Sequence, residues 1–257
     1  MDEMLLKKTV SKIALRLLIA LAISVSNSAF ASNNFKPGQY LQEGGWGTLT
    51  VMPSSGKGQP FSIQSIGPNT HTCELEGLIQ GTRANLDVDE GEKKCVVLFR
   101  LSNEGIDVTV DERVDNSCRN FCGVRAWFTG MYLKPNKECT YAARSLASKR
   151  FIDFYRKKDY RAARAELEPM LHNCGKTLHM FDDGEIRNDL AITQYHLKDY
   201  SGCLATLAPL AVYARMTSEQ IKEEFAQVDA SVMESIVKSA RTNIGLCSKK
   251  QKIEIVR

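Results

Sequence analysis

The chain has 257 residues and a formal net charge of +4, with 43% hydrophobic and 25% charged residues. Apart from a short tail, Lys249-Lys250-Gln251-Lys252, its basic and acidic residues are interspersed. A clustered basic surface for nucleic acid or anionic membrane is therefore not expected. The length suits one or two globular domains.

The first 31 residues have the pattern of a signal peptide for export. Basic residues precede a short apolar run from Leu17 to Val25, and Ala29-Phe30-Ala31 follows as a cleavage site. The apolar run is far shorter than the roughly 20 residues that a bilayer span needs. We expect cleavage after Ala31, a periplasmic or secreted location, and no membrane span in the remaining chain.

Residues 32–134 are expected to form a disulfide-containing β domain. Polar and apolar residues alternate over 46–52, 61–66 and 106–110, which is the period of a half-buried strand. The run 95–99 is apolar throughout, and 126–132 is a last strand candidate. Glycine- and proline-rich breakers separate these runs, so about seven short strands and a small antiparallel β-barrel or sandwich are expected.

Two cysteine-rich clusters in this half suggest a family. One contains Asn69-Thr70-His71-Thr72-Cys73, and the other is Cys118-Arg119-Asn120-Phe121-Cys122-Gly123-Val124-Arg125-Ala126. Together with Cys95 they resemble a cysteine-rich β domain of exported bacterial proteins, some of which also carry a lysozyme-inhibitor module. The Ser-Gly-x-x-Tyr and Tyr-x-x-x-Thr-Lys-Gly loops of periplasmic C-type lysozyme inhibitors are absent, because Ser55-Gly56 is followed by Lys57-Gly58-Gln59.

Residues 139–248 are expected to form a helical domain with an internal repeat. The segment 155–160, Tyr-Arg-Lys-Lys-Asp-Tyr, is matched 40 residues later by Tyr-His-Leu-Lys-Asp-Tyr at 195–200, and Leu-x-Pro motifs follow both at the same offset. Helices are predicted near 141–157, 160–172, 186–197 and 200–213, with one or two more over 217–246. The pattern resembles tetratricopeptide repeats, although 40 residues exceeds the usual period of 34. A generic helical bundle is the alternative.

The eight cysteines are an even number and all follow the signal segment, as expected for a protein folded in an oxidising compartment. Antiparallel helix ends should bring Cys139 to Cys174 and Cys203 to Cys247. The other four then pair within the β domain, with Cys73–Cys95 and Cys118–Cys122 as the preferred choice.

Few residues point to catalysis. We expect no metal site, because His172, Cys174 and His179 are the only local group and Cys174 is better used in a disulfide. Ser235-Ile236-Val237-Lys238 matches a Ser-x-x-Lys motif without its partner motifs, and Asp182-Asp183 fall in an expected loop with Gly184. His71 is expected to be structural.

Arg119 and Arg125 flank a cysteine-rich turn and, with His71, are the candidate interface residues, although a structural role for each is the alternative. No catalytic residue, cofactor or metal is therefore predicted.

The sequence favours a non-enzymatic periplasmic protein that binds a protein or peptide, with helical repeats as the binding face. A narrower version is an inhibitor or immunity protein that blocks a cell-envelope hydrolase. An envelope enzyme with an unfamiliar site and a structural envelope component are the alternatives. An enzyme would be favoured by a deep cleft between the two domains, lined by arginine, His71 and carboxylates.

Overall fold

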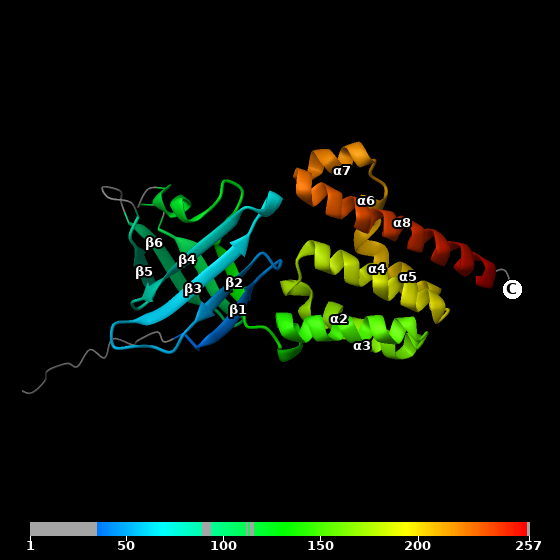
Figure 1. Ribbon diagram of the computed structural model, residues 1–257, viewed down its shortest axis with the longest axis horizontal. Coiled ribbons are helices and arrows are strands. Elements are labelled where there is room, and N and C mark those ends of the chain that lie inside the picture. The colour runs from blue at the N-terminus through cyan, green and yellow to red at the C-terminus, as the bar shows by residue number, and fades with distance from the viewer. Residues whose placement is uncertain (1–34, 89–93, 112, 114–115, 256–257) are drawn as a thin grey trace, which may run out of the picture. The chain divides into compact units, whose positions relative to one another are not determined.

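A computed structural model describes residues 35–88, 94–111, 113 and 116–255. The expected signal peptide, residues 1–31, lies outside the described residues. The described residues form one compact unit in which an antiparallel sheet is followed by α-helices, an α+β arrangement (Figure 1). None of the described helices has the length and apolar character needed to cross a membrane.

The first half is a nearly closed antiparallel β-barrel. Among the described residues it has eight strands, whose spatial order is β4-β3-β2-β1-β8-β7-β6-β5. Hydrogen bonding between β1 and β8 joins the two ends of the meander, and β4 and β5 flank the remaining seam. The strands are β1 Gly38–Gln42, β2 Gly47–Val51, β3 Gln59–Ile66, β4 Thr72–Ile79, β5 Arg83–Leu86, β6 Cys95–Leu101, β7 Gly105–Val110 and β8 Gly130–Leu133.

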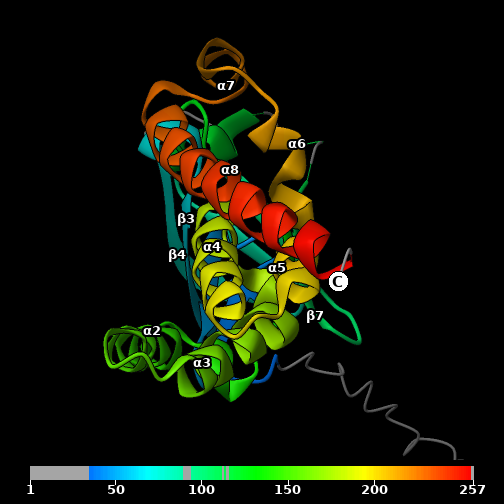
Figure 2. The same ribbon diagram turned by 90° about the vertical axis from the view of Figure 1, so that its right-hand side faces the viewer.

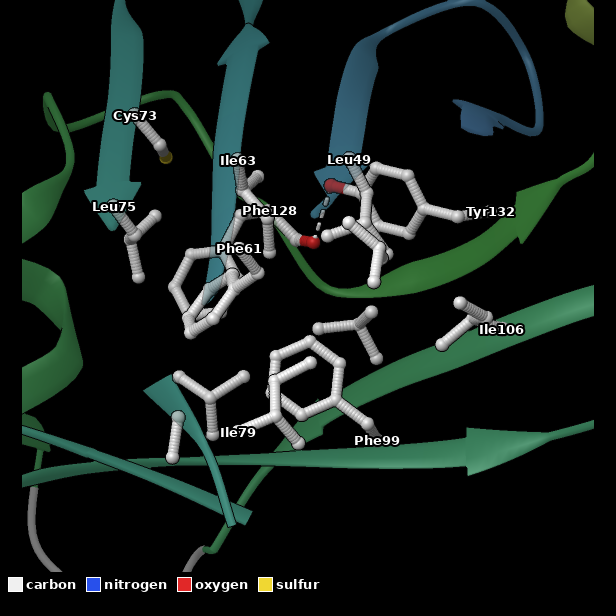
Figure 3. Packing of buried hydrophobic residues seen from close by; sticks show 14 of the residues in the cluster. Leu49, Phe61, Ile63, Cys73, Leu75, Ile79, Phe99, Ile106, Phe128 and Tyr132 are labelled. Carbon is white, nitrogen blue, oxygen red and sulfur yellow. Dashed lines mark hydrogen bonds between the residues drawn. The ribbon is translucent and has the colours of Figure 1, made fainter. Parts of the chain in front are cut away.

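Strict alternation along the strands places one row of side chains inside the barrel. In β3, Phe61 and Ile63 are almost fully buried, whereas Gln64 and Ile66 face outward. The Phe61 and Phe99 rings meet edge to face at 4.9 Å, at the centre of the packed interior (Figure 3). Such aromatic pairs add directional attraction to a large buried apolar area, so the interior is a solid core.

The barrel prediction is confirmed, but strand boundaries differ from those expected. The last strand spans only residues 130–133, because 126–129 run as irregular chain before it. Within that irregular stretch the Phe128 carbonyl accepts a 2.7 Å hydrogen bond from the buried Tyr132 hydroxyl (Figure 3). Apolar residues at 126 and 128 are buried as in a strand, which explains why periodicity alone extended the strand too far.

The predicted disulfides of the barrel are wrong. Cys73 on β4 pairs with Cys122, and Cys95 on β6 pairs with Cys118. The segment containing Cys118 and Cys122 includes a 3-10 turn, Asn116–Phe121, and it receives one disulfide from each of two different strands. Strand β5 lies between the seam and β6, so β4 and β6 are not adjacent strands and Cys73 does not lie opposite Cys95. Proximity in the sequence therefore suggested the wrong partners.

The second half is built from packed helices. The α-helices are α2 Tyr141–Arg156, α3 Tyr160–Cys174, α4 Met180–His196, α5 Tyr200–Leu207, α6 Ala211–Ala214, α7 Ser218–Glu224 and α8 Gln227–Ile255. Helix α8 lies across α4 and α5 (Figure 2). The disulfides Cys139–Cys174 and Cys203–Cys247 confirm the pairing expected from antiparallel helix ends.

The 40-residue repeat of the sequence is also a repeat of backbone geometry. Lys158 and Lys198 both adopt positive φ, 61° and 64°, immediately after a helix. The next residues, Asp159 and Asp199, have nearly the same dihedral angles and cap the following helix. Each aspartate accepts a backbone N–H three residues further on, at 3.1 and 2.9 Å. The Lys-Asp pair is therefore a tight helix-to-helix turn with its own N-cap.

Helix α4 begins at Met180, six residues before the predicted start, so the expected loop at Asp182-Asp183-Gly184 is wrong. His179 caps this helix through Nδ1, and the two aspartates occupy its first turn, where negative charge is favoured by the helix dipole. A Cβ at Gly184 would lie 2.8 Å from Ile236 Cγ2 of α8. Gly184 therefore permits close helix packing and does not mark a turn.

Candidate functional site

Arg119 holds the chain that follows it. Its guanidinium donates to three backbone carbonyls, those of Ala126 at 2.8 Å, Gly123 at 3.1 Å and Val124 at 2.7 Å. Charge-assisted bonds to three carbonyls fix the irregular segment before β8 in place. These bonds give Arg119 the structural role that is the alternative to its expected interface role.

The two cysteine-rich clusters form one structural unit. His71 packs on Gly123, where a Cβ would lie 2.7 Å from the imidazole Nδ1, and the Gly123 N–H donates to the Thr72 carbonyl at 2.8 Å. The Cys73–Cys122 disulfide is adjacent. His71 is half-buried in this contact, whereas Arg125 presents its side chain to solvent. Of the three predicted interface residues, Arg125 is thus the one that is openly exposed.

Asn69, in the same cluster, reaches the first turn of α8. Its backbone N–H donates to Asp229 Oδ2 at 2.9 Å, and its side-chain Oδ1 accepts from the Val228 N–H at 3.4 Å. Asn69 has a φ of 59°, a conformation that asparagine adopts more readily than most residues. The cluster therefore supplies a helix cap to α8 from outside the helix.

A groove lies between α2 and α4, and we call it the α2–α4 groove. It encloses about 330 Å³. Residues spaced three or four apart on each helix face the same side, so each helix contributes one stripe to the lining. The lining comprises Tyr141, Arg144, Ser145, Ser148, Lys149, Ile152, Met170, Asp182, Glu185 and Ile186.

Arg144 crosses the groove at its N-terminal end. Its Nη1 donates to Asp182 Oδ2 at 3.0 Å, and 18% of its side chain is exposed. Its Nε is buried without a hydrogen-bond partner among the described residues. A buried donor of this kind costs free energy unless water or a ligand satisfies it. Arg144 is therefore a polar group that gains from additional partners.

A second hollow of about 410 Å³ adjoins this end and shares Tyr141 and Arg144 with the α2–α4 groove. Its other walls come mainly from β1 to β4 and combine neutral polar with apolar side chains. The charged residues in its lining are Arg144 and Glu74, and His71 is not part of it. The Tyr141 side chain is 78% exposed, so an aromatic ring stands free where the two hollows meet.

Two carboxylates on α4 lie in an environment that disfavours their charge. Burial, and secondarily the charge of Asp182, raise the pKa of Glu185. Asp189 lies one turn further along α4 with its outer edge exposed. The surrounding protein, and secondarily Glu185, raise the pKa of Asp189 to about 6. Both shifts mean that nearby positive charge would be favourable.

Aromatic rings cluster where the end of α2, the start of α3 and the end of α4 meet. The Tyr155 hydroxyl lies 3.3 Å from His196 Nε2, and the Tyr160 ring stacks on the imidazole at 4.3 Å with an interplanar angle of 9°. Burial, with smaller effects from Tyr160 and Asp189, raises the pKa of Tyr155. Asp189 is therefore close enough to Tyr155 to influence it electrostatically.

The remaining candidate groups of the sequence are held in disulfides or lie apart from one another. All eight cysteines form disulfides, and no group of three His, Cys, Asp or Glu side chains suited to a metal occurs in the described part of the chain. His172 and His179 do not converge: His172 lines a hollow with Asn136 and Cys139, and His179 packs against Trp46. Ser235 lies within α8, with its backbone carbonyl accepting from Ser239.

The groove residues were missed from the sequence. Their signal is the spacing of residues by three and four along both helices, 141-144-148-152 and 182-185-186. Placing the start of α4 at residue 186 left Asp182 and Glu185 in a loop and concealed the second stripe.

Comparison with known proteins gives no family. No protein-family model, no curated protein and no solved structure matches the chain. The chemistry of the α2–α4 groove is therefore the basis for assigning a function.

Proposed function

We propose that the protein is an exported, non-enzymatic protein-binding protein whose α2–α4 groove receives a segment of a partner protein. The groove carries this proposal because it combines a free aromatic ring, exposed apolar surface and unsatisfied polar groups. Tyr141 is 78% exposed and Ile152 is 43% exposed. Aromatic and arginine side chains such as Tyr141 and Arg144 are the residue types that anchor protein interfaces.

The disulfides support both the compartment and the mode of binding. Four of them indicate an oxidising extracellular or periplasmic compartment. Two cross-link the helices, so α2 and α3 are tied at one end and α5 is tied to α8. A preformed groove loses little conformational entropy on binding, which favours affinity.

The paired helices support the interpretation of the helical half as tetratricopeptide-like repeats. The repeated Lys-Asp turns place α2 and α4 in equivalent positions of two successive helix pairs. In stacked helical repeats the surface formed by equivalent helices is the usual binding surface. The α2–α4 groove lies between two such helices.

A narrower form of the proposal is an inhibitor or immunity protein for a cell-envelope hydrolase. It is supported by the resemblance of the Asn-x-His-x-Cys and Cys-x-x-x-Cys-Gly-x-Arg-Ala clusters to exported proteins that carry inhibitor modules. In that case the partner captured by the groove is a hydrolase. Adding this protein in stoichiometric amounts should then lower the activity of that hydrolase.

Site-specific photo-crosslinking tests the proposal. A photoreactive residue at Ile152 should capture a defined partner from an envelope extract of the source organism, whereas the same residue at Arg161, exposed on α3, should not. The purified partner should then bind the unmodified protein, and Tyr141→Ala with Ile152→Glu should weaken that binding at least about tenfold. Equal binding by the groove variants would refute the groove as the site.

A further inference from the structure

The outer face of the barrel forms the floor of the second hollow, which lies between β1 to β4 and the start of α2 and which we call the barrel–α2 hollow. Strand pairing sets one residue from each of four neighbouring strands side by side in a row: Leu41, Thr48, Gln64 and Glu74. Neighbouring residues along these strands, such as Leu49, Ile63 and Leu75, are buried inside the barrel. The row therefore faces outward into the hollow, with about 4.8 Å between one strand and the next.

The polar side chains of this floor are open and uncharged apart from Glu74. Four of them line the hollow without a side-chain hydrogen bond to any described residue: Gln39, Thr48, Gln64 and Thr72. The Ser65 hydroxyl, in contrast, is used within the fold, where it donates to the Trp127 carbonyl at 2.6 Å. Amide and hydroxyl groups both donate and accept hydrogen bonds, so the floor is complementary to a ligand that does both.

Two aromatic side chains add apolar faces to this polar floor. Trp46 comes just before β2, and its ring meets the His179 imidazole edge to face at 4.4 Å, which fixes its orientation. Tyr141, the first residue of α2, lines the same hollow with its ring largely exposed. The face of an aromatic ring carries partial negative charge and attracts the slightly positive C–H groups of a saturated ring.

The charges of the lining disfavour other classes of ligand. Arg144 is the cation of this lining and is already paired with Asp182 at 3.0 Å, so a phosphate or carboxylate finds no free cation among the described lining residues. Glu74 is the one carboxylate of that lining, whereas a divalent cation needs several oxygen ligands. Sites for apolar molecules are lined mainly by apolar groups, but here polar side chains outnumber the aliphatic pair, Leu41 and Ile66.

We propose that the barrel–α2 hollow is a binding site for a short neutral saccharide. Sugar rings combine hydroxyl groups that donate and accept with C–H faces that stack on aromatic rings, which is the combination that this lining complements. The hydroxyls bond to Gln39, Thr48 and Gln64, the Glu74 carboxylate accepts from a further hydroxyl, and the C–H face packs on Trp46 or Tyr141. The volume of about 410 Å³ lies within the range of roughly 300–1,000 Å³ of small-ligand sites. This site does not depend on protein binding in the α2–α4 groove.

Intrinsic fluorescence tests the proposal directly. The chain has two tryptophans; Trp46 lines the hollow, and the Trp127 ring lies 5.1 Å from it. Neutral oligosaccharides chosen from a glycan array, with chito-, malto- and cello-oligosaccharides as the first probes, should give a saturable change in emission. Thr48→Ala/Gln64→Ala should weaken that binding about tenfold or more, because two hydrogen-bonding groups are lost.

A matched variant removes the same chemical groups elsewhere on the barrel. Asn85 on β5 and Thr109 on β7 are exposed, and neither lines the hollow. Asn85→Ala/Thr109→Ala should therefore leave saccharide binding unchanged. Ile152→Glu alters the α2–α4 groove alone and should also leave it unchanged.

The possible results are distinct. Saccharide binding that Thr48→Ala/Gln64→Ala leaves intact, or that Ile152→Glu abolishes, would place the sugar elsewhere and overturn the site. No saturable change with any neutral glycan of the array would overturn the ligand class. A saturable change with uncharged serine- and threonine-rich peptides but none with glycans would do the same and would assign the hollow to a protein ligand.

Discussion

The packing of α4 against α8 depends on the absence of a side chain at Gly184, and this can be measured. A Cβ at this position would lie 2.8 Å from Ile236 Cγ2, 3.4 Å from Ile236 Cδ1 and 3.7 Å from Leu210 Cδ2. Carbon atoms prefer separations of about 3.5–4.0 Å, so the nearest contact is too short. Isoleucine is branched at Cβ and has little rotamer freedom in a helix, so Ile236 cannot simply turn away.

Two opposing effects determine the result of Gly184→Ala. Replacing glycine by alanine inside a helix gains about 1 kcal/mol of stability. Overpacking a well-packed core costs about 1–3 kcal/mol. We expect a net loss of about 1 kcal/mol. Gly245 in α8 has no atom within 4 Å of its ideal Cβ, so Gly245→Ala should gain about 1 kcal/mol.

Urea unfolding followed by circular dichroism, with the disulfides intact, measures these differences. The two glycine substitutions should differ by about 2 kcal/mol and in sign. In an Ile236→Ala background, which lacks the obstructing methyl, Gly184→Ala should become stabilising by about 1 kcal/mol. Ile236→Val retains Cγ2 and should not relieve the clash. If Gly184→Ala stabilises the protein as Gly245→Ala does, the close packing of α4 on α8 at Gly184 is refuted.

Further predictions concern a disulfide, two helix caps and two titratable side chains. The Cys203–Cys247 disulfide closes a separation of 44 residues, so replacing both cysteines by serine should lower stability by up to about 4 kcal/mol, measured by urea unfolding. Asn69→Gly keeps the positive φ but removes the side-chain cap of α8, and a loss of about 1 kcal/mol is expected; no loss would argue against the cap. Burial lowers the pKa of His179, so the unfolded chain binds more protons below pH 6.5 and stability should fall as pH drops from about 7 to 5. His179→Asn keeps a capping side chain without this titration, and its unfolding midpoint should vary less over that range. The pKa of Asp189 is raised to about 6, so its ionised form destabilises the fold. Asp189→Asn should therefore stabilise the protein at neutral pH, by less than about 1 kcal/mol because the carboxylate is partly exposed, and the gain should disappear below about pH 4.

Several features could be predicted because their causes are local in the chain. Alternation along β3 indicated a strand, and the Lys-Asp-Tyr motifs indicated two equivalent turns. The Cys139–Cys174 disulfide was predicted correctly because a short turn forces α2 and α3 to be antiparallel, which fixes which ends meet. The Cys203–Cys247 disulfide was predicted correctly because the start of α5 meets the end of α8, although α6 and α7 lie between these helices in the chain. In each case a short-range pattern and one topological rule were sufficient.

The barrel disulfides show where local information fails. Cys73 and Cys95 are separated by 22 positions in the chain, and nothing near either residue indicates that the segment around Cys118 would receive a bond from each of their strands. That outcome depends on the closure of the sheet through β1 and β8, which joins residues about 90 positions apart. Gly184 is similar, because its role as a packing surface depends on the position of α8.

The sequence by itself determined the structural class of each half, the internal repeat and the presence of disulfides. The reason is that the hydrophobic period, the turn residues and the even cysteine count are all local features of the chain. Only the tertiary structure decided the barrel connectivity, the true start of α4 and the α2–α4 groove. The groove residues belong to two helices that start about 40 residues apart, and their meeting is set by packing of complete helix pairs. Arg144 and Asp182, which pair across this groove, are 38 positions apart in the chain, and their contact became visible only in the folded structure.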